Sequence, residues 1–245
     1  MPYGTPVGDL SRLTGFLSVL QLSDSAFPSG RYTLSYGLEA FAQSGVLGTP
    51  CRGSTLLTLL RDCIRFGVAP SDGVALACAH RATGRDGCLD LELVTRADER
   101  LTAVKLPREA REASTRTGRA LLNTAAAVLE ESAMLEYVER VATERSPGNH
   151  AVVLGVISAR LGVPGVEAVT GELYAFSAGW VAAAVRLALI DHRTAQTLLH
   201  RVRPLTAAAA VKAVDRDVAD ISSCTPLLDV MAMRHEQAEL RLFAS

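Results

Sequence analysis

Residues 20–43 read LQLSDSAFPSGRYTLSYGLEAFAQ, and this stretch predicts a corner between two helices. Its apolar start gives way to Ser23-Asp24-Ser25, whose short polar side chains favour helix ends and turns. Phe27-Pro28-Ser29-Gly30 then predicts a tight turn, because proline lacks a backbone donor and glycine adopts positive φ freely. The second helix is expected to carry Tyr32, Tyr36, Leu38 and Phe41. Taken one residue at a time, the stretch is an ordinary corner whose aromatic side chains face a core.

As a whole string, the same stretch resembles the N-terminal signature of the UreF family of urease accessory proteins, roughly LQLxDSxFPxGxxxxSxGLE. The matching residues are Leu20, Gln21, Leu22, Asp24, Ser25, Phe27, Pro28, Gly30, Ser35, Gly37, Leu38 and Glu39. Family members often carry glycine where Arg31 and Tyr36 stand here. These two departures leave the detailed shape of the turn open.

Two further motifs extend this resemblance along the chain. The central motif, roughly RxAREASxxxGRxLL, is matched by Arg111, Glu112, Ser114, Gly118, Arg119, Leu121 and Leu122. The terminal motif, roughly P-x-LD-x6-HE-x4-RLFxS, is matched by Pro226, Leu228, Asp229, His235, Glu236, Arg241, Leu242, Phe243 and Ser245. We therefore expect one UreF-like helical domain over residues 1–245, with 1–10 and 240–245 flexible when the protein is free.

Composition favours an all-α protein. Of the 245 residues, 49% are hydrophobic but only 5% are aromatic, which suits closely packed helices built from Ala, Leu and Val. No stretch alternates apolar and polar residues as a half-buried strand would, and the periodicity predicts about ten helices. The apolar stretch 173–190, interrupted by Arg186, is expected to be a buried helix at the centre of the fold.

Several helix boundaries are predicted from local signals. Pro70-Ser71-Asp72 is expected to start a new helix with Ser71 as its N-cap, and Pro204 is expected to separate a helix at 196–202 from another at 206–220. Asn149 is a candidate N-cap for a helix that begins near 151, which places His150 in its first turn. Arg186 requires a carboxylate or carbonyl partner if it is buried.

The sequence contains no recognisable catalytic or metal-binding motif. It has no GxxxxGK[ST] phosphate loop, no GxSxG elbow and no HExxH pair, and its five histidines are dispersed. We therefore assign no catalytic residue, no metal ligand and no cofactor. The N-terminus lacks a secretion signal, and the scattered cysteines fit a reducing cytosol.

Three classes of function are compatible with these sequence features. The first is a scaffold that works through protein contacts. The second is a helical enzyme with dispersed acid–base residues, such as His150 with Glu39 or Asp24. The third, a nucleic-acid binder, depends on the arginine-rich face at 108–119, and the net charge of −1 argues against it. An arginine face is also typical of plain solvated helices or of protein interfaces.

The resemblance favours the scaffold. It implies a non-catalytic, cytoplasmic urease accessory protein that helps to insert nickel into apo-urease by bridging UreD (UreH in some systems) and the GTPase UreG, and that commonly forms a homodimer, with no nucleic acid or membrane as a partner. Candidate partner-binding residues are Asp24, Ser25, Phe27, Pro28, Gly30, Tyr32, Tyr36, Glu39, Arg111, Glu112, Arg119, His235, Glu236, Arg241 and Phe243.

Overall fold

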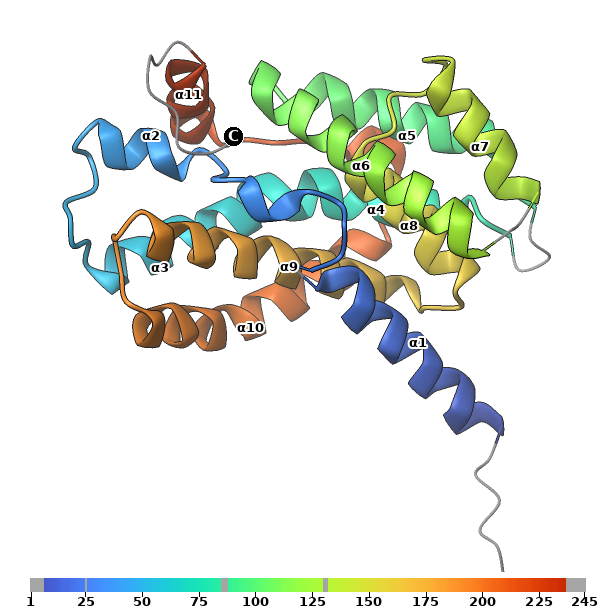
Figure 1. Ribbon diagram of the computed structural model, residues 1–245, viewed down its shortest axis with the longest axis horizontal. Helices are drawn as coiled ribbons and strands as arrows, with labels where there is room; N and C mark the ends of the chain where they lie inside the picture. Colours follow the sequence, from blue (N-terminus) through green and yellow to red (C-terminus); the bar gives the residue numbers. More distant parts are fainter. Residues whose placement is uncertain (1–6, 25, 85–87, 130–131, 237–245) are drawn as a thin grey trace, which may run out of the picture.

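The computed structural model describes residues 7–24, 26–84, 88–129 and 132–236, and the protein is all-α over these residues (Figure 1). The α-helices are α1 (Val7–Ser23), α2 (Leu38–Gln43), α3 (Gly53–Asp62), α4 (Val74–Arg81), α5 (Leu91–Val104), α6 (Arg108–Leu129), α7 (Ser132–Ala142), α8 (His150–Arg160), α9 (Gly165–Arg186), α10 (His192–Val214) and α11 (Pro226–His235). A π-helix, η2 (Cys63–Gly73), joins α3 to α4, and short 3₁₀ turns lie at η1 (Arg31–Thr33) and η3 (Val218–Asp220). Because α3, η2 and α4 form one continuous rod, the described residues contain ten separate α-helical rods, which confirms the predicted fold class.

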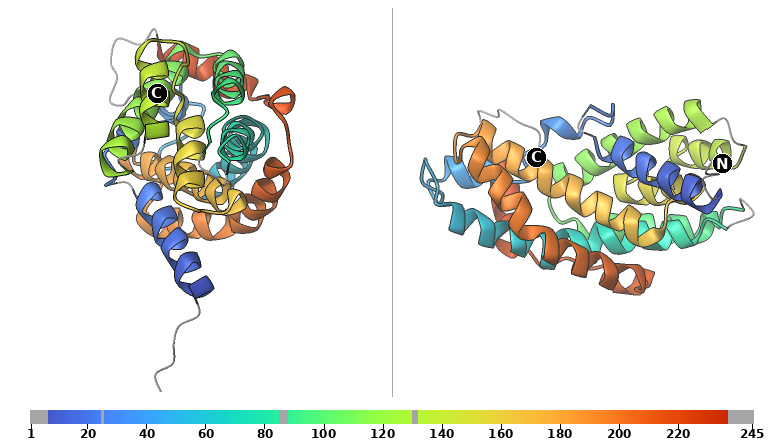
Figure 2. Two further views of the ribbon diagram at one scale, coloured as in Figure 1. Left: turned by 90° about the vertical axis from the view of Figure 1, so that its right-hand side faces the viewer. Right: turned by 90° about the horizontal axis from the view of Figure 1, so that it is seen from below.

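Helix α9 runs through the middle of the molecule, as the apolar run 173–190 predicts (Figure 1). It contacts α1, α2, α4, α8, α10 and η2, and Trp180 on it is fully buried. Figure 2 shows α9 and α10 side by side along their length. By length and composition alone α9 could span a membrane, but most of its apolar window lies inside the protein, as expected of a core helix. Arg186, near its end, donates from Nη2 to the Leu34 carbonyl at 3.3 Å, a partner of the predicted kind.

The prediction that Pro70 starts a new helix was wrong. The chain continues helically through it, and the wider π-helical turn of η2 accommodates the proline, whose ring and missing N–H an α-helix interior disfavours. The Ser71 hydroxyl donates to the Gly67 carbonyl at 2.8 Å and therefore does not act as an N-cap. The Pro70 carbonyl accepts from the Ser222 N–H at 3.0 Å, and the Phe66 carbonyl from the Cys224 N–H at 2.9 Å. The segment before α11 is thereby fastened to η2.

The predicted break at Pro204 was wrong for a similar reason. Helix α10 continues from His192 to Val214 with Pro204 inside it. Leu198, Leu199 and Val202 before the proline and Thr206 and Ala210 after it are all buried. Burial of one face along the whole of α10 outweighs the tendency of a single proline to end a helix.

Three helices approach so closely that only glycine fits between them. A Cβ on Gly118 of α6 would lie 2.0 Å from the Gly148 carbonyl oxygen and 2.7 Å from the His150 nitrogen. A Cβ on Gly155 of α8 would lie 2.4 Å from the Leu76 carbonyl oxygen of α4. Backbone atoms cannot swing aside as side chains do, so these glycines fix the distance of α8 from both neighbours.

We predict that Gly118→Ala lowers the free energy of unfolding by at least ~2 kcal/mol, because the new methyl group forces α6 away from the start of α8. Urea denaturation followed by circular dichroism measures this. Gly48→Ala is the matched control, since its Cβ would meet nothing closer than 3.8 Å, and we expect a change within ~0.5 kcal/mol. Equal stability of the two variants would contradict the close approach.

Candidate functional site

A buried ion pair lies where the signature turn meets the core. Arg31, at the start of η1, donates from Nη1 to Glu172 Oε2 at 2.7 Å and from Nη2 to Oε1 at 2.9 Å. Glu172 is on the central helix α9 and its side chain is only 5% exposed. The bidentate geometry is the strong form of a guanidinium–carboxylate pair, and it ties the turn to the centre of the fold.

His150, the first residue of α8, completes this cluster. Its Nε2 lies 3.1 Å from Arg31 Nη1, and because a guanidinium can only donate, Nε2 must be the acceptor. The imidazole is therefore neutral, with its proton on Nδ1. Burial lowers the pKa of His150 well below its ordinary value, and the positive charges of Arg31 and Lys105 lower it further. Burial raises the pKa of Glu172, although Arg31 acts in the opposite direction.

The position of His150 is set by Asp98 of α5, which is fully buried. Its carboxylate accepts from the Ser146 hydroxyl and the Gly148 N–H, both at 2.6 Å, and from the Asn149 N–H at 2.9 Å. The Asn149 side-chain amide also donates to Asp98, at 2.7 Å, and to Thr102 Oγ1, at 2.7 Å. The predicted N-cap role of Asn149 was therefore only half right: it is the N-cap residue of α8 by position, but its side chain is used to hold the preceding loop.

A cavity of about 200 Å³, with a mostly apolar lining, lies beside the cluster. A second ion pair borders it, in which Lys105 Nζ lies 2.8 Å from both carboxylate oxygens of Asp72 on η2. Ser114 also lines the cavity, and its Oγ has no hydrogen-bond partner among the described residues. A buried hydroxyl of this kind is normally satisfied by ordered water, and the cavity has room for several molecules.

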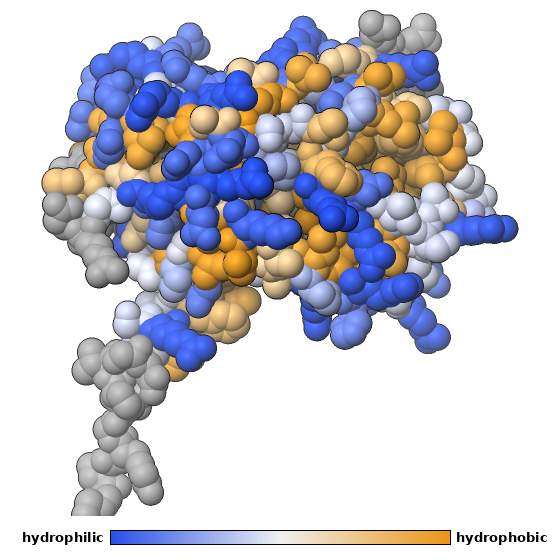
Figure 3. Space-filling view, turned by 180° about the vertical axis from the view of Figure 1, so that it is seen from behind, coloured by the Kyte–Doolittle hydropathy of each residue, from blue (hydrophilic) through white to orange (hydrophobic). Residues whose placement is uncertain are grey.

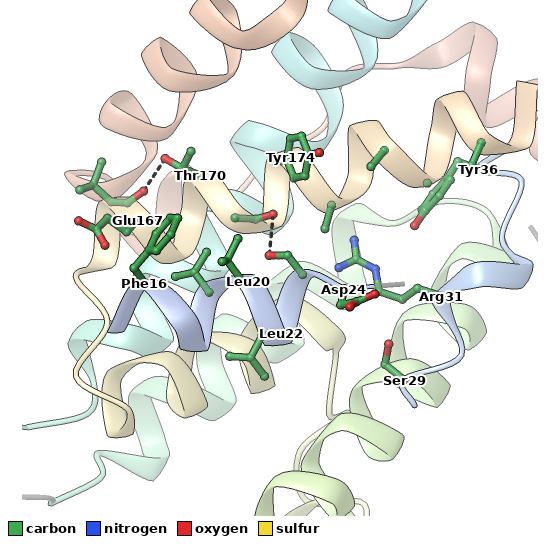
Figure 4. Close-up of a pocket in the computed structure, with 18 of the residues that line it drawn as sticks. Phe16, Leu20, Leu22, Asp24, Ser29, Arg31, Tyr36, Glu167, Thr170 and Tyr174 are labelled. Carbon is green, nitrogen blue, oxygen red and sulfur yellow. Dashed lines mark hydrogen bonds between the residues drawn. The ribbon is translucent and has the colours of Figure 1, made fainter. Parts of the chain in front are cut away.

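A larger groove opens on the outside, between α1 and α9 (Figure 4). It has a volume of about 1310 Å³, and Figure 4 shows Phe16 and Leu20 of α1 facing Tyr174 and Thr170 of α9 across it. Arg31 and Tyr36 line both the groove and the smaller cavity. These two residues of the signature turn therefore form the wall between the two spaces.

The signature turn differs in detail from the predicted corner. The second helix begins at Leu38, so Tyr32 lies in η1 and Tyr36 precedes the helix with a left-handed φ of 52°. Tyr36 stands at such a position although it is not glycine, and its ring packs edge-on against Phe176 with centroids 4.9 Å apart. The glycines at 30 and 37 are also left-handed, with φ of 78° and 77°. The turn is thus longer than predicted and runs to residue 37.

The structure places the predicted partner-binding residues in different environments. Asp24, Pro28, Gly30, Glu112 and Arg119 are exposed, and Phe27, Tyr36, Arg111 and Glu236 are half-buried. Glu39, in contrast, is fully buried on α2, so a partner cannot reach it in this conformation. Ser25, Arg241 and Phe243 lie outside the described residues, as do the side chains of Tyr32 and His235.

Two of these side chains have intramolecular roles. Arg111 donates from Nη1 to the Lys105 and Leu106 carbonyls, at 2.7 and 2.6 Å, and so binds the end of α5. Glu236 accepts from the Glu109 N–H at 3.1 Å, which places a carboxylate at the start of α6, where the helix dipole favours it. Arg108 and Glu112 form an exposed i,i+4 pair at 3.5 Å, as on an ordinary solvated helix face.

Sequence reasoning missed Glu172, Asp72 and Lys105. A signal for Glu172 was present, because a carboxylate in the buried middle of a largely apolar helix requires a cationic partner. Its partner comes from 141 positions away, so the pairing itself was not readable. Within the described ranges, no three His, Cys, Asp or Glu side chains are arranged to hold a metal ion.

We predict that His150 makes the protein less stable below pH 6.5. There the unfolded chain binds a proton that the native imidazole cannot, so the free energy of unfolding falls as pH falls, by up to ~1.4 kcal/mol per pH unit. Urea denaturation at pH 7.5 and 5.5 measures this. His150→Gln is expected to lose less stability across this range than the wild type, whereas His192→Gln, at an exposed position, should behave as wild type. An unchanged pH dependence in His150→Gln would contradict the assignment.

Comparison with known proteins gives a consistent result. The UreF family model matches residues 51–203. A protein named urease accessory protein UreF 2 from Brucella canis is 30% identical over 233 residues, which cover 94% of this chain and 92% of the relative. The urease accessory protein UreF of Trichodesmium erythraeum is 32% identical over 235 residues, with 94% of this chain and 96% of the relative covered. The chain therefore belongs to the UreF family.

Proposed function

We propose that this protein is a non-catalytic accessory factor in urease maturation that works in the cytoplasm. In this proposal it bridges UreD (or UreH) and the GTPase UreG, and so promotes GTP-dependent insertion of nickel into apo-urease. The observation that carries the proposal is the likeness to proteins named urease accessory protein along 94% of the chain, rather than over one isolated motif.

Two exposed surfaces support a role in protein contacts. The first is the signature turn, where Asp24, Pro28 and Gly30 are exposed and Phe27 and Tyr36 are half-buried. Partly exposed aromatic side chains are typical anchors of protein interfaces. The second is α11, which exposes Leu227, Val230 and Met233 and carries Glu236 at its end. Helix α11 packs mainly on α2 and α6, so much of its apolar surface is left for a partner.

The apolar face of α1 supports self-association. Helix α1 projects from the body of the molecule (Figure 1), and Figure 3 shows apolar side chains among polar ones where it emerges. Its side chains that are 51–63% exposed are Leu10, Leu13, Phe16, Leu17 and Leu20. Leu10, Leu13, Leu17 and Leu20 follow the 3–4 spacing of a helix-packing seam. We propose a homodimer in which α1 of each copy enters the α1–α9 groove of the other, since one surface offers both a ridge and a groove.

The enzyme alternative receives less support. Its candidate base, His150, is buried, and its Nε2 already accepts a hydrogen bond from Arg31. A general base must reach the proton of its substrate.

We predict that the tagged protein co-purifies with its own organism's UreD or UreH and UreG when these are co-expressed, most completely with GTP and nickel present, and that alone it hydrolyses no GTP. Asp24→Ala and Tyr36→Ala should each reduce the recovered partners while circular dichroism still shows a helical fold. Lys212→Ala, an exposed change on α10, is the control. Normal recovery with both turn variants would show that the turn has only a structural role.

We predict that Leu13→Asp combined with Leu17→Asp converts the dimer to a monomer. Each apolar anchor is typically worth ~2 kcal/mol, and a two-fold interface contains each twice, so the dissociation constant should rise at least ~100-fold. Analytical ultracentrifugation measures this. Val211→Asp is the control, because Val211 is equally exposed but lies on α10. The surface is refuted if the double variant stays dimeric or if the wild type is monomeric at every concentration.

A further inference from the structure

Cationic side chains gather on the outer side of α10 and of the rod formed by α3, η2 and α4. Helix α10 contains three arginines and one lysine but no aspartate or glutamate. The whole chain has 25 Lys and Arg against 26 Asp and Glu, so this uneven charge is a local feature. We define the basic face by five exposed arginines of the two elements, which are Arg61, Arg65, Arg193, Arg201 and Arg203.

The packing of the rod on α10 brings these arginines together. A Cβ on Gly53, at the start of the rod, would lie 3.1 Å from Thr194 Cγ2 of α10. A Cβ on Gly73, farther along the rod, would lie 3.6 Å from the Ala213 Cβ. The two elements therefore run side by side in the same direction, and these two contacts bracket four of the five arginines. Figure 1 shows α10 at the opposite edge of the molecule from α11.

The charge of the basic face is not neutralised within the described part of the chain. None of the five arginines forms an ion pair there, and neither does the exposed Asp62. The acid nearest to the start of α10 is its N-cap, Asp191, which accepts from the Thr194 N–H at 2.7 Å. The Arg65 guanidinium lies 5.6 Å from the centre of the Phe66 ring, a contact that leaves its charge in place. Like charges on neighbouring helices repel, and a bound anionic partner would relieve that repulsion.

The rest of the molecule determines which kind of anion fits this face. Because the net charge is −1, the surface outside the basic face carries an excess of acidic groups. Charges in physiological salt act over only ~8 Å, so an acidic patch on a folded protein can contact the basic face alone. A long nucleic acid or a charged membrane would also meet the acidic surroundings. The planar guanidinium suits paired hydrogen bonds to carboxylates, and arginine is enriched at protein interfaces.

Short side chains lie among the arginines. Thr58 of α3 and Thr197, Ala207 and Ala208 of α10 are all exposed. They let the backbone of a partner approach both helices closely, while the longer arginines reach outward to its carboxylates. A contact made mainly by exposed charges gains speed and specificity of association more than affinity. The basic face is therefore suited to a reversible contact.

We propose that the basic face is a docking surface for an acidic patch on another protein. None of its five arginines lines the α1–α9 groove, and none belongs to the signature turn or to α11. The basic face can therefore be occupied while those surfaces hold their own partners. The inference depends on charge and packing, and it does not depend on which accessory proteins bind elsewhere. Failure of the co-purification experiment would leave it intact, and its own failure would leave the proposed function intact.

Fluorescence anisotropy with a fluorescein-labelled peptide of ten glutamates tests the basic face in the full-length protein. The wild type should bind the peptide, and added salt should weaken the binding. Arg61→Glu combined with Arg201→Glu should raise the dissociation constant at least ~10-fold, because attractive contacts become repulsive. Arg96→Glu combined with Arg116→Glu is the matched control, since these exposed arginines lie on α5 and α6. The control should change the dissociation constant by less than ~2-fold, because its charges lie beyond the range of screened interactions.

A milder pair separates loss of binding from loss of folding. Arg61→Ala combined with Arg201→Ala should weaken peptide binding at least ~3-fold, with an unchanged circular dichroism spectrum. Equal weakening in the control pair, or no binding of the peptide by the wild type at low salt, would overturn the proposal. An oligodeoxynucleotide with the same number of charges and phosphatidylserine vesicles serve as competing probes. Tighter binding of either one than of the peptide would assign the face to another class of partner and would also overturn the proposal.

Discussion

The buried carboxylate of Asp98 is the constraint on which the site depends. It gathers the Ser146 hydroxyl, two backbone N–H groups and the Asn149 amide, and so fixes the loop between α7 and α8. Gly118 then lets α6 close over that loop. Burial raises the pKa of Asp98, and its hydrogen bonds offset part of this cost. Because α8 begins directly after the loop, Asp98 determines where His150 stands, and His150 with Glu172 determines where Arg31 can dock. One carboxylate on α5 thereby helps to position the signature turn, which lies on the other side of α8.

Arg31 and Tyr36, the two positions at which this turn departs from the family signature, both border the groove and the cavity. On one side is an apolar groove suited to a helix, and on the other is a smaller cavity that is bordered by two ion pairs. A protein that acts by contacts needs an exposed surface, but it does not need buried ion pairs, which cost desolvation energy. These ion pairs lie beside the signature turn, and Arg31 of the turn belongs to one of them. A partner that contacts the turn would therefore also act on charged groups inside the protein. Helix α11 lies against α2 and α6, so the signature turn and the segment 223–232 border the same cavity.

The helical fold and the positions of most helices were predictable, whereas the long-range ion pairs were not. Apolar periodicity marks α3, α5 and α9 because each buries one face or its whole circumference. The prolines at 70 and 204 misled the prediction, since local chemistry disfavours them in helices while burial along the whole rod, and a π-helical turn at Pro70, outweighs that preference. The turn was predicted at its start and misplaced at its end, because Tyr36 adopts a φ that its residue type disfavours. Arg31 and Glu172 carry no local sign of each other.

The late position of α9 in the chain has a consequence for how the protein is made. Helix α1 and the rod of α3, η2 and α4 pack on α9 and α10, whose residues begin at 165. A ribosome adds ~5–20 residues per second, so α1 waits on the order of ten seconds before its packing partner exists. Through that interval Val19 and Leu22 of α1, which pack against the core in the folded protein, and the apolar side of the rod are exposed to other nascent chains. The N-terminal helices therefore cannot complete their packing in the order in which they are made, because the helices that cover them come last.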